Sequence, residues 1–292
     1  MKKIKTYFNE IAVVLILLFS LLGCDSNDDS NDSETDEKRT IIEMDTPVNS
    51  DINWKDVKMV WNEEFQEATS LEDTWNYETM DFITPDNTDG LQIYRKENAE
   101  VSGGTLKIHA KENDGVYTSA RLSSKPAFKY GRVEIGVKLP EEGINGIWAS
   151  IGLLGVNIEE VGWPQCGEID IMEYFSNSPN KIFNYIHSST NNTENGTLLS
   201  ASYPIESAEE EIHAYGLLWT DKYLKFYVDD PDNITYTFLR PSSPTEENWP
   251  FNQPLFLLTG LVIGGSYGGE GVDASLFPAS MEIDYIRVYH PN

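Results

Sequence analysis

The chain has 292 residues, of which 40% are hydrophobic and 12% aromatic, a composition typical of a globular protein. Its formal net charge of −27 argues against a nucleic-acid-binding role, which needs a cationic surface, and against strongly anionic polysaccharides as partners. The length allows one large domain or two small ones.

Residues 1–23 have the pattern of a secretory signal. A lysine-rich start precedes an apolar run from Ile11 to Gly23, which is too short to span a membrane as a helix. The run ends in "LLGC", which resembles the lipobox of bacterial lipoproteins. The resemblance implies cleavage before Cys24 and lipidation of that residue, and an ordinary signal peptide is the alternative.

The stretch that follows Cys24 begins "DSNDDSNDSETDEKRT" and contains almost no apolar residues. It cannot bury enough surface to offset its chain entropy, so we predict a flexible acidic tether over residues 24–52. An aspartate-rich stretch directly after the lipidated cysteine resembles the surface-export signals of Bacteroidetes lipoproteins. We therefore expect anchoring to the outer membrane, facing outward and held only by the lipid, with an inward-facing lipoprotein as the alternative.

Residues 53–292 are predicted to form a single all-β domain. Apolar side chains alternate with polar ones in "TLKIHAK", "GRVEIGVKL" and "YLKFYVDD", which is the pattern of half-buried antiparallel strands. Turn-forming clusters such as "SGG", "PEEG", "DDPDN" and "RPSSP" separate these segments, and no long stretch has a helical period. The pattern favours two sheets packed face to face in a β-sandwich of jelly-roll, concanavalin-like type.

The cysteine count predicts a domain without an internal disulfide. Cys24 is assigned to lipidation, which leaves Cys166 without a partner. No neighbouring residue could serve as an activating base for Cys166, so a nucleophilic role is disfavoured.

The segment "GEIDIMEYF" places three carboxylates in a strand-forming stretch, although acidic residues are poor strand formers. On a regular strand Glu168 and Asp170 share a face, whereas Glu173 points the other way. A one-residue β-bulge at Ile171 or Met172 would bring all three carboxylates onto one face and leave one of these two apolar residues in the core.

Paired carboxylates in a groove lined by aromatic rings are typical of a glycosidase, and Tyr174 and Phe175 directly follow the three carboxylates. If the carboxyl groups of the two glutamates approach to about 5–5.5 Å, one can attack the anomeric carbon while the other protonates the leaving oxygen. Crowding raises the pKa of the proton donor, as that role requires. An acidic exposed strand or a calcium site is the alternative that spacing alone leaves open.

The segment "WPQCGEIDIMEYF" resembles the active-site strand of glycoside hydrolase family 16, in the bulged form typical of laminarinases. The resemblance extends over the domain through "MVWNEEF", "YTSARLSSKPAFKYGRVEIGVKLP", "HAYGLLWTDKYLKFYVDD" and "FPASMEIDYIRVY". It implies Glu168 as nucleophile, Glu173 as general acid/base, and Asp170 as the residue that tunes the nucleophile. It also implies a concave groove, a β-glucan substrate, a monomer and a reaction without a catalytic cofactor.

The resemblance carries further residues of this chain into the substrate site. Trp148 and Trp163 match sugar-stacking positions, Arg121 and Asn98 match positions that reach sugars in the negative subsites, and His187 matches a histidine on the leaving-group side. A core role is the alternative for any single Trp and is favoured for Trp219, and a surface-loop role is the alternative for His187. Family members often hold a structural calcium through a Glu near the start and an Asp near the end of the domain, which match Glu64 and Asp284.

The chain departs from the laminarinase pattern in its groove lining. Gly152 stands where these enzymes commonly have Trp, Gly260 replaces Asn, and Tyr267 replaces a Trp that usually follows and remains a candidate substrate contact. A thinner lining puts strict β-1,3 specificity in doubt. We therefore expect mixed-linkage β-1,3-1,4-glucan to be preferred to laminarin, and we expect Gly152→Trp to shift that preference back if the ring fits.

Two other functions remain open from the sequence. A lectin-like sandwich could capture glycans without cleaving them, although such a protein would need neither a nucleophile nor a proton donor. A family 16 enzyme could also act on xyloglucan, agar or carrageenan. The scarcity of basic residues near the predicted groove disfavours the sulfated galactans among these.

Overall fold

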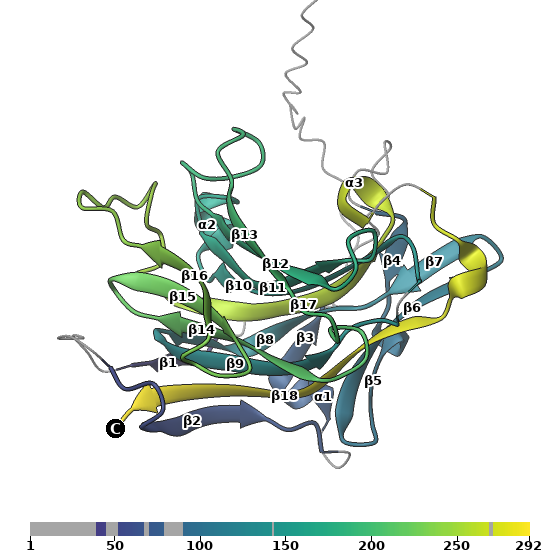
Figure 1. The fold of residues 1–292 in the computed structure, drawn as a ribbon, viewed down its shortest axis with the longest axis horizontal. Helices are drawn as coiled ribbons and strands as arrows, with labels where there is room; N and C mark the ends of the chain where they lie inside the picture. The colour runs from purple at the N-terminus through teal and green to yellow at the C-terminus, as the bar shows by residue number, and fades with distance from the viewer. Residues whose placement is uncertain (1–38, 45–51, 67–69, 79–89, 142, 269–270) are drawn as a thin grey trace, which may run out of the picture. The chain divides into compact units, whose positions relative to one another are not determined.

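A computed structural model of the chain describes residues 39–44, 52–66, 70–78, 90–141, 143–268 and 271–292, without the side chains of Ser266 and Tyr267. In this part the predicted strands form two sheets that pack face to face (Figure 1). The predicted all-β sandwich is confirmed.

One sheet has eight strands and carries the "GEIDIMEYF" segment in β11. Most neighbouring strands are antiparallel, but β1 pairs with β8 in parallel. Its order is β1 (Ile41–Glu43), β8 (Arg121–Lys129), β17 (Leu255–Ile263), β10 (Ile147–Gly155), β11 (Glu168–Phe175), β12 (Lys181–His187) and β13 (Leu199–Pro204), with β3 (Trp75–Tyr77) also on β8.

The second sheet has ten strands. The long strand β18 joins its two halves, because it pairs with β9 along one side and with β6 and then β2 along the other. The order is β16 (Ile234–Leu239), β15 (Tyr223–Val228), β14 (His213–Trp219), β9 (Gly131–Lys138), β18 (Ala279–Pro291), β6 (Thr105–Asn113), β7 (Val116–Ser119) and β4 (Gln92–Tyr94), with β2 (Val57–Glu63) on β18 and β5 (Ala99–Ser102) on β6.

The core lies between the sheets and contains the residues that the alternation predicted. Leu106 and Ile108 of β6, Val133 of β9 and Leu224 of β15 are all fully buried in one hydrophobic cluster. Trp219 is also fully buried, which confirms its core role. Burying each large apolar side chain stabilises the fold by about 1.5–3 kcal/mol.

The ordered fold begins before the boundary predicted at residue 53. Strand β1 lies within the stretch assigned to the tether, and its backbone pairs with β8 from Ile41 to Glu43. The alternation was missed because three residues are too short a stretch to show a period. The compact unit that contains the sandwich starts at Arg39. The predicted signal peptide and Cys24 lie outside the described residues.

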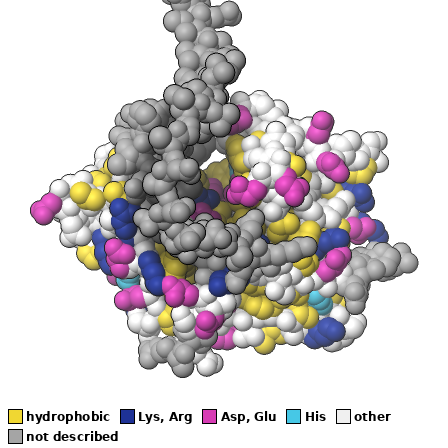
Figure 2. All heavy atoms as spheres, turned by 180° about the vertical axis from the view of Figure 1, so that it is seen from behind, with side chains coloured by type: hydrophobic (Ala, Val, Ile, Leu, Met, Phe, Trp, Pro, Cys, Tyr) yellow, Lys and Arg dark blue, Asp and Glu magenta, His cyan; other side chains and the backbone are white. Residues whose placement is uncertain are grey.

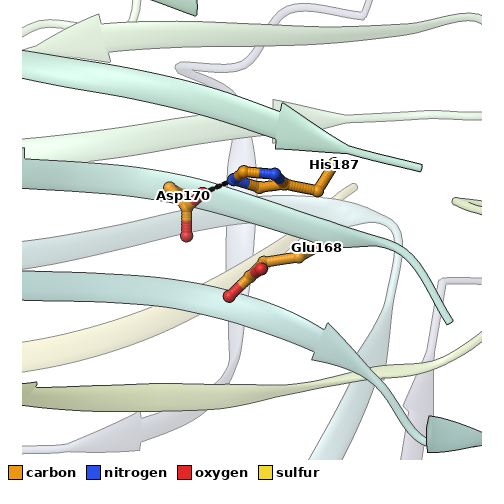
Figure 3. A group of neighbouring side chains, drawn as sticks. All are labelled: Glu168, Asp170 and His187. Atoms are coloured by element: carbon orange, nitrogen blue, oxygen red, sulfur yellow. Dashed lines mark ion pairs between the residues drawn. The ribbon is translucent and has the colours of Figure 1, made fainter. Parts of the chain in front are cut away.

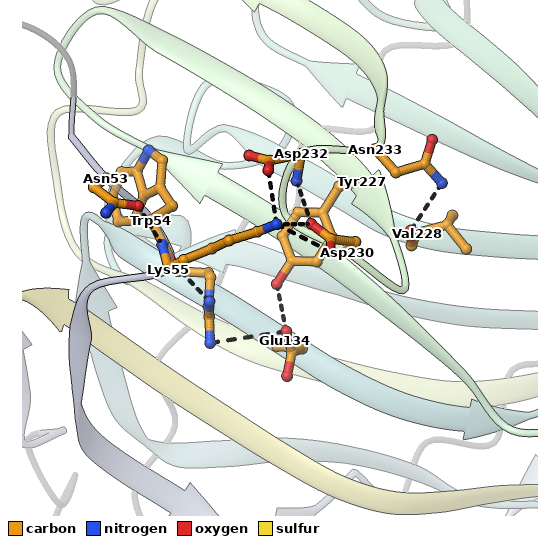
Figure 4. Close-up of polar contacts among 10 residues, drawn as sticks. Asn53, Trp54, Lys55, Glu134, Tyr227, Val228, Asp230, Asp232 and Asn233 are labelled. Carbon is orange, nitrogen blue, oxygen red and sulfur yellow. Dashed lines mark hydrogen bonds and ion pairs between the residues drawn. The ribbon is translucent and has the colours of Figure 1, made fainter.

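The segment around Trp54 is fastened to the outer face of the ten-stranded sheet (Figure 4). Arg132 donates a hydrogen bond of 2.7 Å to the Trp54 carbonyl, and the Trp54 indole donates one of 3.0 Å to the Tyr223 hydroxyl. Lys55 forms ion pairs with Asp230 and Asp232 at the end of β15. These contacts hold the segment before β2 against the ten-stranded sheet, which does not contain β11.

Helices in the described part are short, as the sequence predicted. They are α1 (Leu71–Thr74), α2 (Ile158–Val161), α3 (Gly265–Gly268) and the 3₁₀ turns η1 (Lys96–Asn98) and η2 (Ala274–Leu276). Within the described residues, no helix has the length and apolar character needed to cross a membrane.

Charged side chains of both signs are interspersed with apolar ones on the face seen in Figure 2. No continuous basic surface is visible on the described part of this face. This distribution agrees with the acidic composition, which disfavours polyanionic partners.

Candidate active site

A β-bulge in β11 brings the three carboxylates onto one face of the eight-stranded sheet. The pairing of β11 with β10 shifts register between Asp170 and Met172, so that Ile171 is the extra residue. Glu168, Asp170 and Glu173 thereby lie opposite Leu154, Gly152 and Ser150, which alternate along β10 and face away from the core. The predicted bulge is confirmed. We call this outward surface of the sheet the carboxylate face.

Both bulge residues point into the core, where one had been expected to do so. Ile171 and Met172 are both buried, with exposed fractions of 1% and 0%, and belong to the main hydrophobic cluster. Because two residues of a bulge share one partner position, their side chains can take the same side of the sheet. Ile151 of β10 is their common neighbour.

A glycine allows β11 to start at Glu168. Gly167 has φ +78°, a left-handed conformation that disfavours other residues. A Cβ atom there would lie 2.7 Å from the Cγ atom of Pro250. Gly167 therefore sets the position at which the carboxylate face begins.

Glu168 is surrounded by groups that shift its pKa in opposite directions. The indole nitrogen of Trp163 donates a hydrogen bond of 2.7 Å to Glu168 Oε2. Burial and the charge of Asp170 raise the pKa of Glu168 to about 7. His187, Trp163 and Arg121 act in the opposite direction and limit that rise.

Asp170 pairs with His187, which lies opposite Glu168 on the neighbouring strand β12 (Figure 3). Their atoms Oδ2 and Nε2 are 3.0 Å apart, and Asp170 is only 2% exposed. Burial lowers the pKa of His187, but the hydrogen bond to Asp170 and the nearby charge of Glu168 outweigh it, so the pKa is raised overall. The neighbouring carboxylates therefore favour the protonated form of the imidazole.

Glu173 has no cation among the groups that shift its pKa, and the residue is only 7% exposed. Burial, followed by the charges of Asp170 and Glu168, raises the pKa of Glu173 well above its usual value. A hydrogen bond from Trp148 opposes this rise. Glu173 is thus the group on this face that keeps its proton most readily.

The arrangement separates two chemical roles on one strand. Glu168 accepts a hydrogen bond from Trp163 and lies near the charges of His187 and Arg121, which favour its carboxylate form, so it is the better placed of the two for nucleophilic attack. Glu173 holds a proton that can be given to a leaving oxygen. A pair of acids whose surroundings push their pKa values apart is what glycosidic bond cleavage needs.

The two Trp residues expected to stack on sugars each contact one of the two glutamates predicted to be catalytic. Trp163 is half-buried and its ring centre lies 5.4 Å from that of His187, in addition to its bond to Glu168. Trp148 is half-buried beside Phe175, with ring centres 5.9 Å apart. These contacts assign each Trp a positioning role beyond stacking.

Sequence reasoning missed an aromatic column on β12. Phe183 and Tyr185 lie opposite Glu173 and Asp170 on the carboxylate face, with stacked rings 6.2 Å apart. Tyr185 is in turn stacked at 6.2 Å on His187. The alternation of aromatic rings in "FNYIH" could have revealed the column, because every second residue of a strand shares a face.

Arg121 lies on the carboxylate face, whereas the side chain of Asn98 is used within the fold. Arg121 pairs with Gly260 of β17, and its Nε atom lies 3.3 Å from Glu78. Asn98 is 1% exposed, and its Nδ2 atom donates to the carbonyl of His109 and to the hydroxyl of Thr118. No contact in the described part joins Asn98 to the carboxylates.

Gly152 lies on the carboxylate face, as expected, but leaves no room for a larger side chain. A Cβ atom would lie 2.9 Å from both Asp170 Oδ1 and the Ile169 carbonyl. Gly152→Trp would therefore displace Asp170, and its effect would not report on linkage preference. The side chain of Tyr267, in α3, lies outside the described residues.

The expected calcium ligands do not fit a metal site through their side chains. Ile286 of β18 pairs with Glu63, so Glu64 and Asp284 are close in the sheet. However, Arg287 donates two hydrogen bonds, of 2.7 and 2.8 Å, to the Glu64 carboxylate. A guanidinium at this place repels a divalent cation.

One group in the described part has donor atoms close enough for a metal, namely Glu168, Asp170 and His187, within 4.8 Å of one another. The ion pair between Asp170 and His187 accounts for this proximity. A protonated imidazole cannot act as a metal ligand. The cluster is better explained as an acid–base site.

Comparison with known proteins agrees with this geometry. The model of "Glycosyl hydrolases family 16" matches residues 86–287. A β-glucanase of Rhodothermus marinus is 35% identical over 247 residues, covering 80% of this chain and 85% of that protein. The crystal structure of a laminarinase from Flavobacterium sp. UMI-01 is 38% identical with a TM-score of 0.74, covering 80% of this chain and all of that one. The structure of SCLam, a non-specific endo-β-1,3(4)-glucanase, is 30% identical with a TM-score of 0.72, covering 88% and 98%. This chain belongs to glycosyl hydrolase family 16.

Proposed function

We propose that the protein is a retaining endo-β-glucanase that cleaves β-1,3-glucan, mixed-linkage β-1,3-1,4-glucan, or both. The observation that carries this proposal is the contrast between Glu168 and Glu173 on one face of β11. The ionised form of Glu168 is favoured by the Trp163 hydrogen bond and by the charges of His187 and Arg121, whereas the pKa of Glu173 is raised further, so Glu173 keeps its proton.

The reaction follows from these two roles. Glu168 attacks the anomeric carbon and forms a glycosyl ester, while Glu173 gives its proton to the departing glycosidic oxygen. Glu173, now ionised, takes a proton from water, and that water releases the sugar from Glu168 with the original configuration. The steps need two carboxyl groups and water, without a catalytic cofactor. Both glutamates come from one strand, so a monomer suffices.

The relatives support a β-glucan as the polymer. Their names specify β-glucanase, laminarinase and endo-β-1,3(4)-glucanase activities. A non-catalytic glycan-binding role is disfavoured because both glutamates are present in different electrostatic surroundings. Xyloglucan stays as a second polymer to be tested.

The test is incubation with laminarin, barley β-glucan, lichenan, xyloglucan and agarose, with sizing of the products. We expect short oligosaccharides from the first three and none from agarose. NMR of the first product from a β-glucan should show the β anomer, and an α anomer would contradict the mechanism. No cleavage of any β-glucan would contradict the proposed function.

We also propose that the protein is a lipoprotein of the outer membrane, exposed at the cell surface. The support is the "LLGC" segment and the acidic stretch that follows Cys24. Cys24→Ala should move the protein from the membrane fraction to the soluble one with unchanged specific activity. If labelled fatty acid did not enter the wild type, the lipidation proposal would fail.

A further inference from the structure

We propose that a cavity beside the carboxylate face, with a volume of about 580 Å³, receives a single glucosyl branch of the glucan chain. The proposal rests on the proposed function and adds a feature of the substrate. We call this cavity the side pocket. Its lining residues are Asn157, Val161, Gln165, Ser189, Arg240, Pro244, Thr245, Glu246, Glu247, Trp249, Pro250, Asn252 and Gln253.

The side pocket lies past the ends of the strands that carry the catalytic groups. Gln165 is three residues before Glu168, and Ser189 is two residues after His187. Residues of the segment 240–253, which leads into β17, form another part of the pocket wall. The pocket therefore lies past the strand ends, near the start of β11, where Glu168 is located.

The main glucan chain would pass beside the side pocket and would not enter it. Groups suited to sugars flank the carboxylates on both sides, with Arg121 on β8 and Tyr185 on β12. A polymer that contacts both strands must run across the sheet. A pocket at the strand ends then faces a substituent of the chain, such as a glucose attached to a primary hydroxyl.

Two amide side chains in the pocket wall are fixed by hydrogen bonds and present complementary groups. Gln253 donates from Nε2 to the Cys166 carbonyl at 2.7 Å, which leaves its Oε1 to accept. Asn252 accepts at Oδ1 from the Tyr130 hydroxyl and the Trp249 indole, at 3.0 and 3.1 Å, which leaves its Nδ2 to donate. A sugar hydroxyl both donates and accepts, so it matches such a pair.

Two other polar atoms of the wall have no hydrogen-bond partner among the described residues. Arg240 Nε and Asn157 Oδ1 are buried without a hydrogen-bond partner in the described part of the chain. A buried donor or acceptor costs free energy unless water or a ligand satisfies it. A polyhydroxylated ligand offers both kinds of partner.

Charge and apolar contacts favour a neutral sugar. Glu246 and Glu247 offset the charge of Arg240, so the side pocket does not suit an anionic ligand. Val161 is 44% exposed and gives an apolar contact for the C–H face of a ring. The volume lies within the range of about 300–1,000 Å³ that is usual for small-ligand sites.

The wall is held in shape by its own backbone hydrogen bonds. The Trp249 amide donates to the Thr245 carbonyl at 2.8 Å, and the Thr190 amide donates to the Glu247 carbonyl at 3.1 Å. A site fixed in this way loses little entropy when a sugar binds.

The experiment compares a linear β-1,3-glucan oligosaccharide with the same oligosaccharide carrying one β-1,6-linked glucose. Val161→Trp fills the mouth of the side pocket, and Arg240→Met removes its cationic donor. Each should lower kcat/KM on the branched substrate by about fivefold or more and change the linear one by less than about twofold. Val116→Trp is the matched control, because Val116 is 49% exposed and is not a lining residue.

The outcomes separate the two proposals. Equal losses on both substrates would show that the pocket holds the main chain, and unchanged rates on both would show that it binds no sugar, so either overturns the branch proposal. Unfolding curves of both variants would detect a folding defect, and the second variant keeps the test decisive if one is destabilised. A wild type that cleaves neither substrate would instead contradict the proposed function on β-1,3-glucan.

Discussion

Glu134 and Glu173 are both largely buried carboxylic acids on outward faces of the two sheets, but their neighbours differ. Glu134, on β9, accepts a hydrogen bond of 2.8 Å from the Tyr227 hydroxyl (Figure 4). It accepts another of 3.4 Å from the Tyr285 hydroxyl, and Arg132 lies 3.9 Å away. Glu173 has acids as its nearest charged neighbours, and their charges raise its pKa.

The comparison shows that burial alone does not make a carboxylate reactive. Glu134 accepts hydrogen bonds from two tyrosine hydroxyls, which fasten β9 to β15 and β18. Glu173 is placed where a negative charge is costly, so the protein holds a proton there at the expense of stability. A buried acid next to other acids therefore indicates chemistry, and one next to donors indicates structure.

The largest expected effect is that of Glu168→Gln. The amide has nearly the same shape but cannot form the glycosyl ester, so we expect kcat to fall by at least about 10³-fold. The folded protein should become more stable at neutral pH, because one of three crowded carboxylates is removed. Activity on barley β-glucan and thermal unfolding measure the two effects, and near-normal turnover would refute the role of Glu168.

The pH dependence of stability sharpens this prediction. The pKa of Glu168 is raised to about 7 in the folded protein, so the folded state keeps a proton that the unfolded chain releases near about 4.3. Stability should therefore fall as the pH rises from about 4.3 to about 7. The fall should be smaller in Glu168→Gln, as measured by urea unfolding at several pH values.

Glu173→Ala should reduce activity on glucans by about 10²–10⁴-fold, because the leaving oxygen loses its proton donor. Activated aryl glycosides should be affected much less, since their leaving groups need no proton. Azide should restore turnover and give a β-glycosyl azide. Formation of the α-linked azide would mean an inverting mechanism.

Glu134→Gln is the matched control on the other sheet. The change weakens the hydrogen bonds from Tyr227 and Tyr285, so we expect a loss of about 1–3 kcal/mol in the free energy of unfolding. The kcat value on glucans should stay within about twofold of the wild type. A large loss of kcat with unchanged stability would break the distinction between the two carboxylates.

The smallest expected effect is a shift in the pH profile. Glu168 must be ionised and Glu173 protonated, so kcat/KM should rise with pH through about 7 and fall at higher pH. His187→Gln removes a cation that lowers the pKa of Glu168, so the acidic limb should move to higher pH. If the acidic limb stayed at the same pH or moved to lower pH, His187 would not be charged in the free enzyme.

The sequence was sufficient to predict the sandwich and the bulge. Alternation in β6, β9 and β15 fixes which side chains are buried, and a period of two leaves little freedom of assignment. The bulge followed from the spacing of Glu168, Asp170 and Glu173, because only an extra residue places them together. Local periodicity thus determines the face on which the carboxylates lie.

Side-chain contacts that depend on loop conformation or strand order could not be predicted in this way. The bond from Trp163 to Glu168 depends on how the segment before β11 folds back, and the use of Asn98 depends on the pairing of β6 and β7. Glu64 meets Arg287 across 223 residues, which no local pattern reports. These partners set the pKa values of the side chains and determine which of them can contact a ligand. They depend on loop conformation and on strand order.

The most direct test of the account is to trap the covalent intermediate with a 2-deoxy-2-fluoro β-glucosyl or laminaribiosyl fluoride. The electronegative fluorine slows release of the sugar more than its capture, so a retaining enzyme accumulates the ester. Peptide mapping by mass spectrometry should find the sugar on Glu168. Labelling of Glu173, or absence of any labelled peptide while a β-glucan is still cleaved, would contradict the assignment of roles on β11.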